Sequence, residues 1–218
     1  MKDEAIKIEN EFDILFKSIN YERVDNYVGK SPNFSNADYI SLEKKVVIEL
    51  KVLDKDFFEE GGIVDCIQGI IPVPKDIEED GQGFYEIKIP KRDRNGKVDT
   101  LEEPLRRIIK KANKQLKETN QRLLDGKGKG FMVLAINMKT TINPEIIRAI
   151  TIKILRKEFL SINAVVFCTP KVGLILNNGF FQPIILHCQD SNLSEEFAKE
   201  LIFIVNSWAY FINNGGHS

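Results

Sequence analysis

Eight consecutive residues, 46–53, form the strongest strand pattern in the chain. Six of them are apolar, and four are valine or isoleucine, which favour extended structure. Alternate side chains of a strand project to opposite faces, so Glu49 and Lys51 share one face. A charged side chain is costly to bury without a partner. The run therefore predicts a largely buried strand that brings an acid and an amine to one site.

The segments around this strand alternate between helical and extended patterns. Residues 38–42 predict the first strand of a hairpin, with the polar residues 43–45 as its turn. We expect an amphipathic helix over 3–20 and a long helix, opened by Pro104, over 104–124. The other expected elements are helices within 56–69, from 144 to about 159 and from 194 to about 212, and strands at 84–89, 131–137, 164–168, 173–176 and 183–187. Hairpin strands must be antiparallel, so the order of elements predicts an α/β fold with a mixed central β-sheet flanked by helices.

The composition indicates one globular domain. The chain has 218 residues, of which 43% are hydrophobic and 29% charged, a balance typical of folded proteins. Three widely spread cysteines fit a reducing compartment. No apolar run reaches the ~18 residues that cross a bilayer, and a charged start argues against a secretory leader. We expect a single cytoplasmic domain without membrane contact, with its core over about 3–137 and a C-terminal elaboration over about 138–218.

Charge is distributed unevenly along the chain. Residues 88–130 hold 14 lysines and arginines against 6 acidic residues, a net charge of +8, whereas the rest of the chain carries −9. A basic segment in an acidic frame favours a nucleic-acid partner on one face. The alternative is a solvated helix face followed by a basic loop, without a polyanionic partner.

Oxygen atoms from two neighbouring strands are expected to meet beside Lys51. Asp38 stands at the head of the first hairpin strand, where it can supply a second carboxylate next to Glu49. With the backbone carbonyl of Leu50, these groups make an oxygen-rich site that suits Mg²⁺, with Mn²⁺ as a possible substitute. An ammonium at that position suits orientation of an attacking water or neutralisation of charge on a phosphate. The pattern indicates phosphodiester hydrolysis.

At these residues the chain resembles the PD-(D/E)xK nuclease superfamily, also called restriction-endonuclease-like. The match consists of Asp38, ten intervening residues and Glu49-Leu50-Lys51, with Ala37 in the place of the family's proline. The family core runs helix, three strands, helix, strand, an order expected here over about residues 3–137. The resemblance implies that Asp38 and Glu49 hold the metal and that Lys51 is the catalytic lysine.

The resemblance also implies auxiliary residues on two helices. Family members often add a glutamate from the first helix, for which Glu11 is the choice here and Glu9 and Glu4 are alternatives. Many members use a lysine or glutamine on the helix after the third strand. Lys111 and Gln115 lie one turn apart on one shoulder of the apolar stripe of the 104–124 helix. They are expected to contact the substrate, whereas Lys110, Lys114 and Lys117 are expected on the solvated side.

These expectations lead to a Mg²⁺-dependent endonuclease, with DNA favoured over RNA as the substrate but not decided by the sequence. A rival motif is Glu86–Lys88 with Asp76 or Asp80 upstream. The alternative function is a non-catalytic module that binds nucleic acid or protein on the same fold. A homodimer is possible, and residues 138–218 contain no motif that indicates a role.

Overall fold

The computed structural model describes residues 2–29, 32–53, 99–136, 144–156, 158–168, 184–188 and 194–213. The helices are α1 (Lys2–Ser18), α2 (Asp25–Val28), α4 (Asp99–Leu123), α5 (Pro144–Leu155) and α6 (Glu195–Asn213). The strands are β1 (Glu22–Arg23), β2 (Tyr39–Ser41), β3 (Val46–Leu53), β4 (Lys129–Ile136), β5 (Ala164–Cys168) and β6 (Ile184–Cys188). Among these described helices, none is both long and apolar enough to span a membrane.

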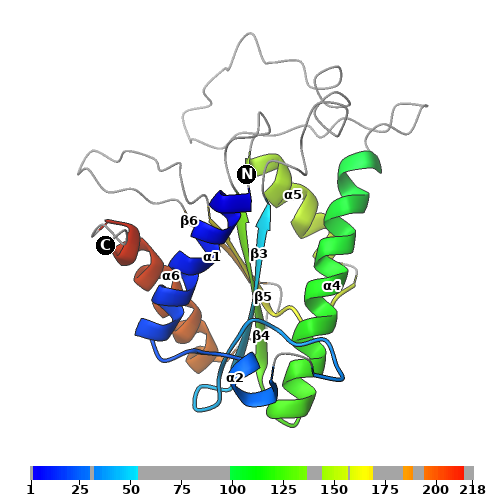
Figure 1. Ribbon diagram of the computed structural model, residues 1–218. Helices are drawn as coiled ribbons and strands as arrows, with labels where there is room; N and C mark the ends of the chain where they lie inside the picture. Colours follow the sequence, from blue (N-terminus) through cyan, green and yellow to red (C-terminus); the bar gives the residue numbers. More distant parts are fainter. Residues whose placement is uncertain are drawn as a thin grey trace.

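The six strands form one sheet in which sequence neighbours are also spatial neighbours. β2 pairs antiparallel with both β1 and β3, and β6 pairs antiparallel with β5. β3, β4 and β5 are parallel, and α4 connects the first two of them over one face of the sheet (Figure 1). The prediction of an α/β fold with a mixed sheet is confirmed.

Helices cover both faces of this sheet. α1 and α6 lie on one side and α4 and α5 on the other (Figure 1). The alternation of side chains along β3 decides which residues meet which layer. Ile48 and Leu50 pack with α1 and α6, whereas Val47 and Leu53 pack with α4 and α5. Glu49 and Lys51 have the parity of Val47, so they project toward α4.

Aromatic rings join the two terminal helices. Phe12 of α1 and Trp208 of α6 are stacked, with ring centroids 4.1 Å apart and planes inclined by 2°. Both side chains are buried, which stabilises the layer through apolar burial and ring contact. The α1 layer is therefore a fixed support behind β2 and β3.

α4 begins earlier than its sequence predicts. The helix starts at Asp99, so Pro104 lies inside it and does not open it. A proline removes only its own backbone donor and crowds the preceding turn. That turn is held from outside, because Glu102 accepts hydrogen bonds from Arg106 at 2.9 Å and Lys153 at 2.6 Å.

Other elements differ from expectation or lie beyond comparison. The sequence did not indicate β1 and α2, and α5 ends at Leu155 instead of near residue 159. The segments expected at 56–69, 84–89 and 173–176 fall outside the described residues, as does the rival motif Glu86–Lys88 with Asp76 or Asp80.

Candidate active site

The site is built around an acid and an amine on the α4 side of β3. The Glu49 side chain is entirely buried, with 0% of its surface exposed. The Lys51 ammonium donates a hydrogen bond to Glu49 Oε1 and lies 3.2 Å from Gln115 Oε1. Parallel pairing sets Glu49 beside Met132 and Lys51 beside Leu134 of β4, so apolar strand surrounds both groups. The ion pair is therefore largely removed from water.

Asp38 reaches the same place from the segment that leads into β2. Its backbone N–H donates to the Ile48 carbonyl at 3.2 Å, and its carboxylate Oδ2 accepts from the Leu50 N–H at 2.8 Å. These two bonds direct the Asp38 side chain onto the edge of β3. A strand residue that pairs through its N–H presents its carbonyl to the same edge, so the Leu50 carbonyl also faces Asp38.

The two carboxyl groups lie close enough for each to change the pKa of the other. Burial raises the pKa of the Glu49 carboxyl to about 8, and the negative charge of Asp38 adds to the rise against the opposing charge of Lys51. Burial also raises the pKa of Asp38, although the Leu50 N–H and the charge of Lys51 act in the opposite direction. Such mutual perturbation in a buried site is typical of catalytic or metal-binding groups.

One oxygen of this cluster is left without a hydrogen bond. Glu49 Oε2 is buried and, when both acids are ionised, receives no hydrogen bond from the residues that the structure describes; with one proton between them, the Glu49 and Asp38 side chains can share a hydrogen bond, which lowers the pKa of Asp38. A buried carboxylate oxygen without a partner is costly, and a divalent cation between Glu49 and Asp38 would remove that cost. Within the described ranges, no three His, Cys, Asp or Glu side chains gather as a metal cage. Two carboxylates and a carbonyl instead suit an ion that keeps several waters, as Mg²⁺ does.

The structure brings both predicted residues of α4 to this site. Gln115 accepts from Lys51 through Oε1 and donates through Nε2 to the Asn36 carbonyl at 2.8 Å. Its amide thus joins Lys51 to the segment before Asp38, and its expected contact with substrate stays a prediction. Lys111 is exposed, and its charge opposes the rise in the pKa of Glu49, so it is the residue of this pair that can reach a ligand.

Two further residues of α4 hold the backbone that precedes Asp38. Glu118 Oε2 accepts from the Ser35 N–H at 2.7 Å, and Thr119 Oγ1 accepts from the buried Ala37 N–H at 2.8 Å. Sequence reasoning missed both. The available signal was Thr119 itself, because it is a polar residue at a buried position on the apolar stripe of the helix.

The first helix brings a further acidic residue near the site. Asp13 of α1 pairs with Arg23 at 2.7 Å, and Arg23 lies 3.7 Å from Asp38. The metal-binding role of Glu11 stays a prediction. Glu11 is half-buried on α1, and the alternative Glu9 is exposed. The side chain of the other alternative, Glu4, is outside the described set. Asp13 and Arg23 were missed because β1, which carries Arg23, was not predicted.

Comparison with models of known protein families, with curated proteins and with solved structures finds no match for this chain.

The hydrogen bond from Ala37 to Thr119 predicts a cost for T119V. This substitution conserves shape but leaves a buried N–H unsatisfied, so we expect a loss of about 1–3 kcal/mol in the free energy of unfolding and faster hydrogen exchange over residues 35–38. T119S should restore both. Thr151 of α5 is the matched control, because its hydroxyl is buried but has no hydrogen-bond partner among the described residues. T151V should not destabilise; a T119V effect no larger than that of T151V would contradict the role of Thr119.

The buried charge of Glu49 predicts that E49Q stabilises the metal-free protein in alkaline solution. Unfolded Glu49 ionises near its ordinary pKa of 4.5, whereas the folded carboxyl holds its proton up to about pH 8. Wild type therefore loses stability relative to E49Q as the pH rises through this window, and the difference stays constant above it. Thermal unfolding in chelator at about pH 5 and pH 9 measures the difference. E43Q, at an exposed position of the same hairpin, is the control; equal stability of E49Q and wild type at both pH values would contradict the prediction.

Proposed function

We propose that this chain is a Mg²⁺-dependent nuclease with a restriction-endonuclease-like core that hydrolyses phosphodiester bonds in DNA. The observation that carries the proposal is the convergence of the Asp38 and Glu49 carboxyl groups beside the Lys51 amine, with Glu49 Oε2 buried and unpaired among the described residues. An acid pair and an ammonium in a desolvated site provide the charges that phosphate hydrolysis requires.

The order of elements supports the proposed core. α1, three antiparallel strands, α4 and β4 follow one another, with the short α2 inserted after β1. This is the helix, three strands, helix, strand order that the resemblance implies. The three strands here are β1, β2 and β3, whereas the sequence suggested 38–42, 46–53 and, as the third, 84–89, which falls outside the described residues.

Each residue of the site has a role in the proposed reaction. Asp38, Glu49 and the Leu50 carbonyl would hold Mg²⁺, or Mn²⁺ in its place. The bound ion would supply Lewis acidity for a water and a phosphate oxygen. Lys51 Nζ, kept in place by Gln115, donates a hydrogen bond to the attacking water or to the phosphate. Gln115 acts as a positioning residue for Lys51, and Lys111 extends toward the substrate.

The exposed face of α4 supports a polyanionic substrate. Between residues 102 and 123 its exposed positions are almost all basic, the exceptions being Glu103 and Gln121. The basic ones are Arg107, Lys110, Lys111, Lys114, Lys117 and Arg122. A helix of 25 residues is about 37 Å long at the standard rise per residue, comparable to one turn of duplex DNA. Lys111 lies on this face and also beside Glu49, so a backbone bound along α4 would pass the site.

We also propose that the protein works in the reducing cytoplasm. Cys168 is a free thiol buried within β5, and burial raises the pKa of this thiol above its ordinary value. A protonated, buried thiol is inert, which is consistent with a structural cysteine.

The catalytic role is tested with K51M. We expect cleavage at least about 100-fold slower than wild type, because the substitution removes a positioned proton donor or acceptor. Substrates should include linear, supercoiled and single-stranded DNA and RNA, each with Mg²⁺, Mn²⁺ and chelator. Lys44 is the matched control, since its side chain is 24% exposed against 18% for Lys51 and it pairs with a glutamate, Glu200, at 2.8 Å. K44M should keep the wild-type rate.

Two outcomes would contradict this proposal in different ways. Equal activity of K51M and wild type would remove Lys51 from the mechanism. A wild-type protein that cleaves none of these substrates with either ion, but still binds one of them, would favour the non-catalytic binding module.

The basic face of α4 predicts salt-dependent binding of DNA. Each lysine that contacts a phosphate contributes about 1 to the slope of log K against log salt. We therefore expect K110Q/K117Q to reduce that slope by about 2, measured by fluorescence anisotropy in chelator. K7Q/K199Q removes two exposed lysines from α1 and α6 in the opposite layer and should leave the slope unchanged. Equal slopes for the two double variants would contradict an α4 contact.

A further inference from the structure

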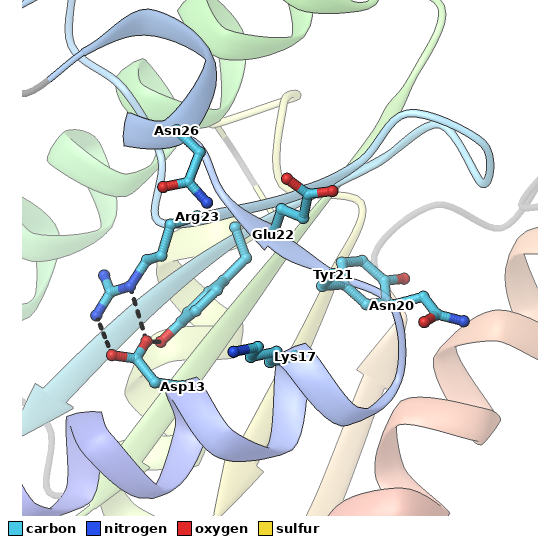
Figure 2. Close-up of a pocket in the computed structure, with 8 residues that line it drawn as sticks. Asp13, Lys17, Asn20, Tyr21, Glu22, Arg23 and Asn26 are labelled. Carbon is cyan, nitrogen blue, oxygen red and sulfur yellow. Dashed lines mark hydrogen bonds and ion pairs between the residues drawn. The ribbon is translucent and has the colours of Figure 1, made fainter.

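Arg23 lies between two carboxylates that come from different elements. Its guanidinium makes a two-point contact with Asp13 of α1, with Nε 2.7 Å from Oδ1 and Nη2 2.8 Å from Oδ2. Its third nitrogen, Nη1, is 3.7 Å from Asp38 Oδ1. Figure 2 shows Arg23 reaching from β1 down to Asp13 on α1. The arginine is therefore directed at the oxygen of Asp38 that does not receive the Leu50 N–H.

The position of this guanidinium is set by more than its charge. Arg23 lies over the ring of Tyr39, with its central carbon 4.8 Å from the ring centroid. The Tyr39 hydroxyl donates to Asp13 Oδ1 at 2.6 Å, which orients the carboxylate that binds Arg23. Tyr39 is buried and directly follows Asp38 in the chain. Because an arginine stays protonated throughout the useful pH range, this arrangement is a permanent positive charge beside Asp38.

Carboxylates on both sides of a cation are also the environment that a second divalent ion requires. Two-metal sites place their ions about 3.5–4 Å apart and share a carboxylate between them. Here Asp38 can share a metal ion only with Glu49, because Arg23 fills the place between Asp38 and Asp13. A second dication there would meet a fixed positive charge at short range.

We propose that Arg23 is a built-in cation that takes the place of a second metal ion, so that the site holds a single divalent ion between Asp38 and Glu49. This inference rests on the proposed function, because it concerns the metal site of that nuclease. Asp13 then binds Arg23 and not a metal ion, and Arg23 is a positioning residue for Asp38.

A pocket beside Arg23 makes the inference testable by substitution. The pocket has a volume of about 580 Å³ and is lined by residues of α1, β1 and β2, among them Asp13, Lys17, Arg23 and Tyr39. Figure 2 shows these side chains around the opening. Asp13 lines this pocket, and the side chains of Asp13 and Asp38 are both partly exposed, so an ion can approach them from solvent once the guanidinium is removed.

The experiment counts Mn²⁺ bound per chain, by calorimetry and by electron paramagnetic resonance, in wild type and variants. We expect about one ion in wild type and none at the same concentrations in D38N. We expect about two ions in R23S, because Asp13 and Asp38 no longer have an arginine between them. R23K keeps a positive charge at this position and should bind about one ion. D13N should also bind one ion, with an affinity within about threefold of wild type.

Arg106 provides a matched control. It too lies between two carboxylates, at 2.9 Å from Glu102 and 3.0 Å from Glu158. Its removal leaves Lys153, which contacts Glu102 at 2.6 Å, so a cation remains. R106S should therefore bind one ion, and a gain of a second ion there would show that exposing any acid pair is sufficient.

The outcomes separate this inference from the proposed function. Wild type that binds no divalent ion would overturn both. Wild type that binds two ions, one of which is lost in D13N, would overturn only the role of Arg23. R23S that unfolds at the wild-type temperature but binds a single ion would reduce Arg23 to a structural link between α1 and β2. If R23S does not fold, R23K and D13N decide the question through the same ion count.

Discussion

Glu49 lies wholly inside the protein, and the cost of an ionised carboxylate there governs the arrangement around it. An unpaired charge in an apolar interior would be lost by protonation or would destabilise the fold by several kcal/mol. The neighbouring groups offset this cost only in part. Lys51 satisfies one oxygen, but the nearby charge of Asp38 adds repulsion, and the pKa of Glu49 remains raised to about 8. A cation bound between the two acids, as proposed above, would offset the remaining cost.

α4 connects this buried cluster to the surface. One side of the helix packs on the sheet and holds Lys51 and the backbone of Ser35, Asn36 and Ala37 through three side chains. The other side is exposed and predominantly basic. Because one rigid helix carries both the side chains that hold the site and the exposed basic side chains, the site would stay at a constant distance from any polyanion bound along α4. Packing of α4 on β3 and β4 therefore fixes the geometry of the site as well as the stability of the layer.

The sequence indicated the elements that apolar periodicity defines. The β-branched run of β3 and the apolar stripe of α4 are formed by burial, which leaves a regular pattern, so both were predicted, along with the hairpin that brings Asp38 toward Glu49. β1 was not, because Glu22 and Arg23 are two polar residues that become a strand only by pairing with β2. The contacts of Asp13 depend on tertiary packing between distant segments, and no local pattern encodes them. Thr119 stands out in the sequence as a polar residue on the apolar stripe of the helix, but its partner Ala37 could be identified only from the fold. The start of α4 was misjudged because the ion pairs of Glu102 outweigh the local effect of Pro104.

Two positively charged side chains, Lys51 and Arg23, flank the acid pair. Their positions determine where the site can bind a metal ion while the fold stays intact. Lys51 occupies Glu49 Oε1, and Arg23 faces Asp38 Oδ1. When both acids are ionised, the formal charges of these four groups cancel. Because the pKa of Glu49 is raised to about 8, the metal-free site at neutral pH carries Glu49 with its proton, which lets the metal-free fold persist. Glu49 Oε2 is the acceptor left over among the described residues. An ion bound at Oε2 would leave the contact of Lys51 with Oε1 intact, so the amine would not be displaced. The same balance implies a moderate affinity for the ion, since every carboxylate it approaches is already partly neutralised.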